Sequence, residues 1–124
     1  VVMNYTETEA KVREATNDEP WGPTVEVLRE LAQATFQFET FPEVMGMLWK
    51  RMLQDNKSNW RRVYKSLVVL HHLLRNGSER VVTSAREHVY DLRSLETYTF
   101  VDDNGKDQGI NIRHKVKDMI DFIQ

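Results

Sequence analysis

The residues best suited to binding chemistry are the basic side chains gathered between Lys50 and Lys65. This window holds six Lys or Arg residues against a single acid, a net charge of +5. The whole chain of 124 residues has a net charge of −2, so the remainder carries −7. Arginine offers a planar fork of donors to phosphate and lysine a mobile point charge. The window therefore indicates either a compact anion site or a solvated charged face.

Residues that could serve an enzyme or a metal are few. The sequence contains no glycine-rich phosphate loop, no nucleophile elbow and no His-Glu-x-x-His motif. His71 and His72 would point about 100° apart on a helix, and the pair His88 and Asp91 lacks a third ligand. The segment starting at Asp102 departs from the calcium-loop pattern at three positions. We therefore expect no metal and no cofactor.

Length and composition favour one compact domain. The chain has no cysteine, which excludes disulfide scaffolds and thiolate catalysis. No apolar run approaches the ~20 residues of a membrane-spanning helix, and the negative net charge disfavours nucleic acid. We expect the three tryptophans, and most of the aromatics at 36, 38, 41, 49 and 60, to pack between helices. Two alternatives are that the aromatics stack on nucleic-acid bases and that a tryptophan inserts into lipid.

Helical patterns run through the chain, and no sustained alternation predicts a strand. Apolar residues recur at spacings of three and four residues. Phe38 is expected to be the last residue of the apolar face of the second helix, and Val89 the last of the fifth. Capping boxes start at Thr6 and Thr40, Asn59 caps the fourth helix, and Asn76-Gly77 stops it. The expected helices span 6–16, 24–37, 40–54, 59–75, a segment from 78, a short one near 92–95 and a last one from about 111. Tyr98 to Gly109 is expected to be a loop. Short helices joined by short turns favour an α-solenoid or an irregular bundle.

Several separate motifs occur in an order that is more specific than composition. They are KVREAT at 11–16, PWGP at 20–23, WKR at 49–51, NWRRVYK at 59–65, NGSERV at 76–81 and GKDQG at 105–109. Together they resemble the epsin N-terminal homology (ENTH) domain over almost the whole chain. The segment RVVTSAREHVYDLRSL at 80–95 resembles the epsin-related branch. The resemblance implies an all-α fold, a right-handed superhelix (α-solenoid) of about seven helices, ENTH/VHS-like.

The resemblance also implies a function. A single ENTH domain over 1–124 would have no enzymatic activity and would bind phosphoinositide headgroups where clathrin coats form. The amphipathic segment that precedes the domain, and the tail that binds clathrin and adaptors, would lie outside this chain. The epsin-related branch implies phosphatidylinositol 4-phosphate at the trans-Golgi network and endosomes. It also implies that the domain binds a SNARE of the Vti1b type through that SNARE's N-terminal three-helix domain.

Two alternatives stay open. One is an endocytic adaptor like the plasma-membrane epsins, which would bind phosphatidylinositol 4,5-bisphosphate. The other is a protein-docking module with little lipid binding in this fragment. In each case we expect a cytoplasmic, peripheral membrane protein, monomeric, on clathrin-coated vesicles.

The family's headgroup residues carry over to four positions of this sequence. They are Arg13, Arg51, Lys57 and Arg62. The loop that holds Lys57 is one residue longer than in plasma-membrane epsins, which have His where this chain has Arg62. An amide position of the family falls on Asp18, with Asn17 beside it as a substitute. Auxiliary lipid contacts are expected from Asn17, Lys50, Arg61 and Lys65.

Only a stack of helices could bring these distant cations together, because they come from different helices and a loop. Each Lys or Arg near an anionic bilayer contributes ~1 kcal/mol. Four or five of them give about 4–5 kcal/mol, which corresponds to millimolar to high-micromolar binding. Residues 1–5 align with the end of the family's inserting segment. We therefore expect the fragment to hold membranes weakly without that segment, since stable anchoring takes two signals.

Overall fold

The computed structural model describes residues 4–124 and is helical throughout. The described chain contains seven α-helices, one short 3-10 helix and no strand beyond an isolated bridge between Val101 and Asp107. The helices are α1 (Glu7–Ala15), α2 (Val25–Ala34), α3 (Phe41–Leu53), α4 (Trp60–Asn76), α5 (Glu79–Glu87), α6 (Val89–Ser94), the 3-10 helix η1 (Leu95–Thr97) and α7 (Gly109–Ile123). The all-α superhelical fold expected from the sequence is confirmed.

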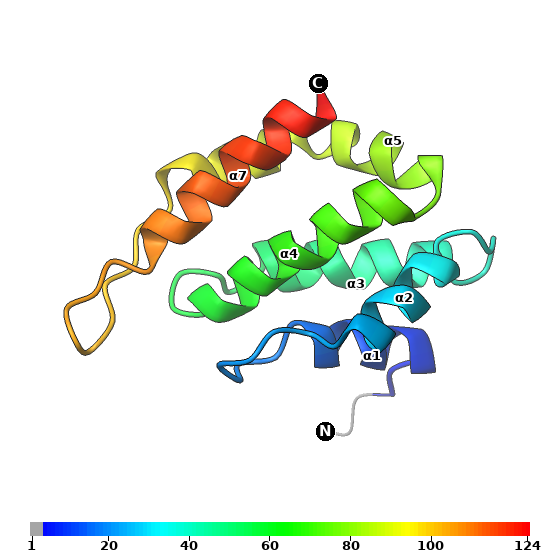
Figure 1. Cartoon of the computed structure of the whole chain (residues 1–124), viewed down its shortest axis with the longest axis horizontal. Helices are drawn as coiled ribbons and strands as arrows, with labels where there is room; N and C mark the ends of the chain where they lie inside the picture. The colour runs from blue at the N-terminus through cyan, green and yellow to red at the C-terminus, as the bar shows by residue number, and fades with distance from the viewer. Residues whose placement is uncertain (1–3) are drawn as a thin grey trace.

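Successive helices stack into layers along the molecule. In Figure 1, α1 and α2 lie at the lower edge, α3 and α4 cross the middle, and α5 and α7 lie at the upper edge. α1 packs on α3, α3 on α4, and α4 on α7, so α4 is the central element. Within the described residues no helix is both long and apolar enough to cross a membrane.

The core follows the predicted helical periodicity. The apolar face expected for α4 is buried, namely Val63, Leu67, Leu70 and Leu74. The face expected for α7 is buried in the same way, namely Ile112, Val116, Met119, Ile120 and Ile123. Spacings of three and four place such residues on one stripe of a helix, and this stripe must be covered by a neighbour.

One predicted capping box is confirmed and the other is wrong. The Thr6 hydroxyl accepts from the amide of Glu9 at 3.1 Å, and the Glu9 carboxylate accepts from the amide of Thr6 at 3.0 Å. Thr40 has helical backbone angles and makes no cap bond. Its hydroxyl donates instead to the carbonyl of Ala34 at 2.7 Å, while Glu43 accepts from the hydroxyl of Thr6 at 3.2 Å. Both partners of the predicted box are therefore used by other helices.

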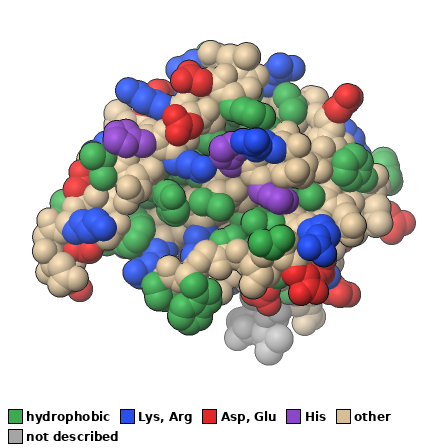
Figure 2. Space-filling view, viewed as in Figure 1, with side chains coloured by type: hydrophobic (Ala, Val, Ile, Leu, Met, Phe, Trp, Pro, Cys, Tyr) green, Lys and Arg blue, Asp and Glu red, His purple; other side chains and the backbone are tan. Residues whose placement is uncertain are grey.

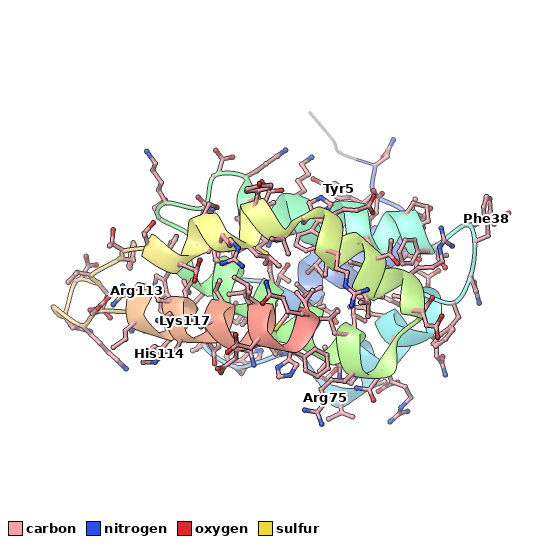
Figure 3. All side chains as sticks on the ribbon, turned by 90° about the horizontal axis from the view of Figure 1, so that it is seen from above. Tyr5, Phe38, Arg75, Arg113, His114 and Lys117 are labelled. Carbon is pink, nitrogen blue, oxygen red and sulfur yellow. The ribbon has the colours of Figure 1, made fainter. Side chains whose placement is uncertain are left out.

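The second helix is shorter than predicted. α2 ends at Ala34, and the chain turns where the sequence predicted helix to Gln37. The hydroxyl of Thr35 donates to the carbonyl of Ala32 at 2.6 Å, which closes the last turn of the helix. Phe38, predicted to be buried, is consequently 83% exposed on a connecting turn and points away from the body of the molecule (Figure 3). Phe36 is exposed beside it.

Other boundaries moved by smaller amounts. Asn59 stands at the N-cap of α4, but its side chain donates to the carbonyl of Asp55 at 2.6 Å and does not cap the helix. The helix stops at Gly77 as predicted. Val89 begins α6 and does not continue α5, and α7 begins at Gly109, two residues earlier than expected.

Candidate functional site

Arg51 is the most buried of the four predicted headgroup residues and is 8% exposed. It lies in the last turn of α3, where its guanidinium reaches the end of α1. Its Nε donates to the hydroxyl of Thr16 at 3.0 Å, and its Nη2 donates to the carbonyl of Thr16 at 3.1 Å. The free carbonyls at the end of a helix carry partial negative charge, so this is a favourable place for a cation.

Two further arginines approach Arg51. Burial, followed by the positive charges of Arg62 and Arg13, lowers the pKa of Arg51 to about 10. Arg62 comes from the first turn of α4, and its Nε is buried without a hydrogen-bond partner in the described structure. Arg13 comes from α1, where its guanidinium stacks over the Tyr5 ring at 4.3 Å from the centroid. We call Arg13, Arg51 and Arg62 the arginine cluster.

The packing of three helices explains this convergence. α1 packs against α3 and also touches α4. Arg51 stands at the carboxyl end of α3 and Arg62 at the start of α4, so a short connection separates them. The arginine cluster therefore forms where α1 crosses the junction between α3 and α4.

No acidic side chain is ion-paired with the cluster in residues 4–124. The ion pairs of the described chain involve other cations, namely Lys11, Arg93 and Arg113. Asp18 contributes an opposing charge, since its carboxylate partly offsets the lowering of the Arg51 pKa. Like charges held together in a partly buried site repel, and an anion that joins them relieves that repulsion.

Lys57 lies in the α3–α4 connection, away from direct contact with the cluster. Its side chain is exposed, and in the described structure it neither forms an ion pair nor changes the pKa of Arg51. The connection itself is held firmly, because the Tyr98 hydroxyl donates to the carbonyls of Asn56 at 2.5 Å and Lys57 at 3.2 Å. Asp55 adopts a positive φ of 50° where the connection leaves α3. The backbone of Lys57 is thus fixed while its ammonium is free to reach outward.

Three of the auxiliary residues gather where the α1–α2 connection meets the first turns of α4. The buried Lys65 ammonium donates to the side-chain oxygen of Asn17 at 2.7 Å, and burial lowers the pKa of Lys65. Arg61 stacks on the Trp60 ring at 4.8 Å and, with Lys65, lines a cavity of about 320 Å³. The oxygen of Asn17 also accepts from the amide of Glu19 at 3.1 Å, so it is already engaged inside the protein.

Lys50 does not join these residues. It lines a separate open groove of about 610 Å³ between α3 and α5, beside Trp49 and His88. Those two rings stack at 4.1 Å with an angle of 11° between their planes, and the Trp49 indole donates to the Ser84 hydroxyl at 3.0 Å. Neighbours on a helix point about 100° apart, which separates Lys50 from Arg51.

The tryptophans divide between packing and exposure. Trp49 is buried and Trp60 packs against the core, as expected. Trp21, expected to pack, is 64% exposed in the connection between α1 and α2. Proline on both sides of Trp21-Gly22 holds this connection open, so the ring has no helix to cover it.

The histidines and the Asp102 loop have structural roles. His71 and His72 lie on α4. Figure 2 shows histidine side chains near basic ones on the face turned to the viewer. No group of three potential metal ligands occurs in the described part of the chain. The Asp102 carboxylate accepts from the amides of Asn104 and Lys106, both at 2.9 Å, and closes the predicted turn.

Sequence reasoning missed Thr16 and Tyr5, which hold two of the three clustered arginines. Thr16 follows the apolar pair Val12 and Ala15 at the end of α1, so its position next to the core was the available signal. Tyr5 precedes the capping box, where nothing in the spacing links it to Arg13 eight residues later.

Comparison with known proteins gives a consistent result. The family model described as "ENTH domain" matches residues 5–124. Clathrin interactor 1 from Homo sapiens is 71% identical over all 124 residues of this chain and 20% of its own length. Epsin-3 from Homo sapiens is 48% identical over the same residues and 20% of its length. The chain thus spans about a fifth of these curated relatives.

Solved structures agree with the sequence comparison. The crystal structure of the human epsinR ENTH domain superposes with a TM-score of 0.96 and 70% identity, covering 98% of this chain and 89% of that one. The ENTH domain from epsin-2 in complex with phosphatidylinositol 4,5-bisphosphate superposes with a TM-score of 0.93 and 36% identity, covering 99% and 86%.

Proposed function

The chain belongs to the ENTH domain family, and on that premise we propose that it is the phosphoinositide-binding membrane adaptor domain of an epsin-related protein in clathrin-coated vesicle traffic. Identity is 71% to Clathrin interactor 1 and 48% to Epsin-3, which confirms the resemblance to the epsin-related branch. Clathrin and adaptor binding would belong to parts of the whole protein beyond this domain.

The arginine cluster is the observation that carries this proposal. Three guanidinium groups from three elements meet at the junction of α1, α3 and α4, and the described structure gives them no carboxylate partner. The unpartnered Nε of Arg62 is a buried donor that an anion can satisfy. Multiply charged phosphates on a compact ring fit such a cluster, since each guanidinium can bind a phosphate through two hydrogen bonds. The exposed side chain of Lys57 would turn toward the bound anion from the α3–α4 connection.

Charge reversal tests the proposal. Arg62→Glu and Arg13→Glu each place an acid in the cluster, and we expect either to remove binding to phosphatidylcholine vesicles that contain phosphatidylinositol 4-phosphate. Arg75→Glu, at an exposed position in the last turn of the same helix α4, is the matched control and should bind like the unaltered chain. Equal binding by all four proteins in co-sedimentation would refute the site.

Headgroup preference and location form the finer part of the proposal. We place the domain at the trans-Golgi network and endosomes, on phosphatidylinositol 4-phosphate. Support comes from Asp18, whose carboxylate acts on both Arg51 and Lys65 and disfavours additional phosphates beside them. Asp18→Asn is therefore expected to strengthen binding to phosphatidylinositol 4,5-bisphosphate more than to the monophosphate. The same gain for both lipids would argue against this preference.

A second proposed function is recruitment of a SNARE through its N-terminal three-helix domain, of the Vti1b type. It is supported by the exposed aromatic pair Phe36 and Phe38 on the α2–α3 connection. Arg51 lies ten residues after Phe41, where α3 begins, which places it about 15 Å along the helix from this connection. Phe38→Ser should weaken pull-down of the SNARE domain and leave lipid binding intact, whereas Arg62→Glu should do the reverse. Loss of both activities in either variant would mean that the two surfaces are not distinct.

A further inference from the structure

Thr16 holds the most buried member of the arginine cluster, and this contact has a functional meaning. We propose that Thr16 is a positioning residue of the anion site, which fixes the guanidinium of Arg51 so that it faces Arg13 and Arg62. The inference rests on the proposed headgroup site and adds to it a residue that does not itself touch the ligand.

Thr16 forms hydrogen bonds through both its side-chain hydroxyl and its backbone carbonyl. Its side chain is fully buried at the end of α1. The hydroxyl donates to the carbonyl of Val12 at 2.8 Å and accepts from Nε of Arg51 at 3.0 Å. Its carbonyl accepts from Nη2 of Arg51 at 3.1 Å. One residue therefore fixes one edge of the guanidinium through two donors, and its own hydroxyl is oriented by the helix that it ends.

This arrangement leaves Nη1 of Arg51 for an anion. The recorded hydrogen bonds of Arg51 use Nε and Nη2, both directed at α1. A planar guanidinium that is anchored along one edge presents its remaining edge in a fixed direction. Like-charge repulsion from the other two arginines would otherwise favour rotation of Arg51 away from them. A ligand then meets a guanidinium that is already oriented, so less conformational entropy is lost on binding.

The chain contains an internal control for the structural part of this role. Thr35 ends α2 as Thr16 ends α1, and it is also fully buried. Its hydroxyl donates to the carbonyl of Ala32 at 2.6 Å and accepts from the amide of Ser78 at 2.9 Å. Thr35 thus has the same kind of helix-end hydroxyl, but it serves a backbone amide and not an arginine.

The test compares Thr16→Val, Thr16→Ser and Thr35→Val in the full chain of 124 residues. Affinity for soluble inositol 1,4-bisphosphate is measured by calorimetry, and the melting temperature is measured in parallel. We expect Thr16→Val to weaken binding about tenfold, the loss of one hydrogen bond to a charged group. Thr16→Ser keeps the hydroxyl and should bind within about twofold of the unaltered chain. Thr35→Val should lower the melting temperature without changing affinity.

A double-variant cycle with Arg51→Lys sharpens the test. Lysine keeps the charge but cannot bridge the hydroxyl and carbonyl of Thr16 with a planar fork. In that background, Thr16→Val should change affinity by less than about twofold, since the positioned group is gone. If Thr16→Val does not fold, Thr16→Ala removes the same hydroxyl and gives the same comparison.

Three outcomes overturn the inference. They are unchanged binding by Thr16→Val, equal weakening by Thr35→Val, and a Thr16→Val effect that persists in the Arg51→Lys background. Failure of the unaltered chain to bind either this probe or vesicles that contain phosphatidylinositol 4-phosphate would instead refute the proposed function itself. The two failures are therefore distinguishable.

Discussion

The Nζ of Lys115 on α7 donates a 2.9 Å hydrogen bond to Nδ1 of His71 on α4. The bond requires an imidazole that is unprotonated at Nδ1, because a cationic lysine can only donate. Burial, followed by the charges of Lys115 and Arg75, lowers the pKa of His71, and the smaller effect of Asp118 opposes this. Burial also lowers the pKa of the neighbouring His72. The hydrogen bond between the last helix and the central one therefore forms only when His71 is neutral at Nδ1.

Acidification is expected to destabilise the domain through these histidines. A histidine whose pKa is lower in the folded chain than in the unfolded one contributes stability above its unfolded pKa, and this stability is lost as the pH falls. The melting temperature should fall between about pH 7.5 and about pH 5.5, on either side of the ordinary histidine value. His71→Gln keeps an acceptor for Lys115 but does not titrate, so its melting temperature should fall less over this range. Equal falls in both proteins would contradict the prediction.

Two glycines, one at the end of α4 and one within α3, are expected to respond in opposite ways to alanine. A Cβ at Gly77 would stand 2.7 Å from the carbonyl oxygen of Leu73 and 2.8 Å from the hydroxyl of Thr35. Gly77→Ala should therefore lower the free energy of unfolding by about 1–3 kcal/mol through overpacking. A Cβ at Gly46, within α3, meets nothing within 4 Å. Gly46→Ala should raise the free energy by about 0.5–1 kcal/mol. Urea denaturation of both variants checks the signs.

Removing one charge from the arginine cluster should separate stability from binding. Arg62→Met removes the unpartnered buried Nε and one positive charge that acts on Arg51. We expect the free energy of unfolding to rise by about 1 kcal/mol, the size of one unmet polar group. Binding to vesicles that contain phosphatidylinositol 4-phosphate should fall by about tenfold or more. A variant that loses both stability and binding would show that Arg62 contributes to the fold itself.

Membrane binding is expected to weaken steeply with salt. The Debye length falls from about 10 Å at 0.1 M to about 3 Å at 1 M ionic strength, so attraction between the cluster and an anionic bilayer is screened. Co-sedimentation across a sodium chloride series should show a steep loss for the unaltered chain and a shallower one for Arg62→Met. Parallel curves for the two proteins would mean that Arg62 takes no part in the attraction.

Periodicity and caps were sufficient to predict most helices, since these signals are local. The box at Thr6 formed because both of its partners lie within one turn. The same pattern at Thr40 failed because the hydroxyl of Thr40 found the carbonyl of Ala34, which no local rule includes. The prediction that Phe38 is buried also relied on a local pattern and was wrong. Its spacing continues the face of α2, whereas the helix ends before it.

The sequence provided a set of candidate residues for the site but not their geometry. The resemblance identified Arg13, Arg51 and Arg62, and the structure places them together. It did not indicate that Arg51 is buried, or that Lys50 beside it faces a different groove. Those facts depend on how α1 crosses α3, which is a property of the packed helices and not of either sequence segment.

The three members of the cluster belong to three separate helices. An anion that bridges them would link three helices that are otherwise joined by the apolar core and by a few hydrogen bonds, such as those of Arg51 to Thr16. A ligand that binds only the folded chain raises its apparent stability by RT ln(1 + [L]/Kd), so the gain grows with the ratio of ligand concentration to Kd. A rise in melting temperature on addition of headgroup therefore measures, without a label, binding of the anion to the folded arrangement of α1, α3 and α4.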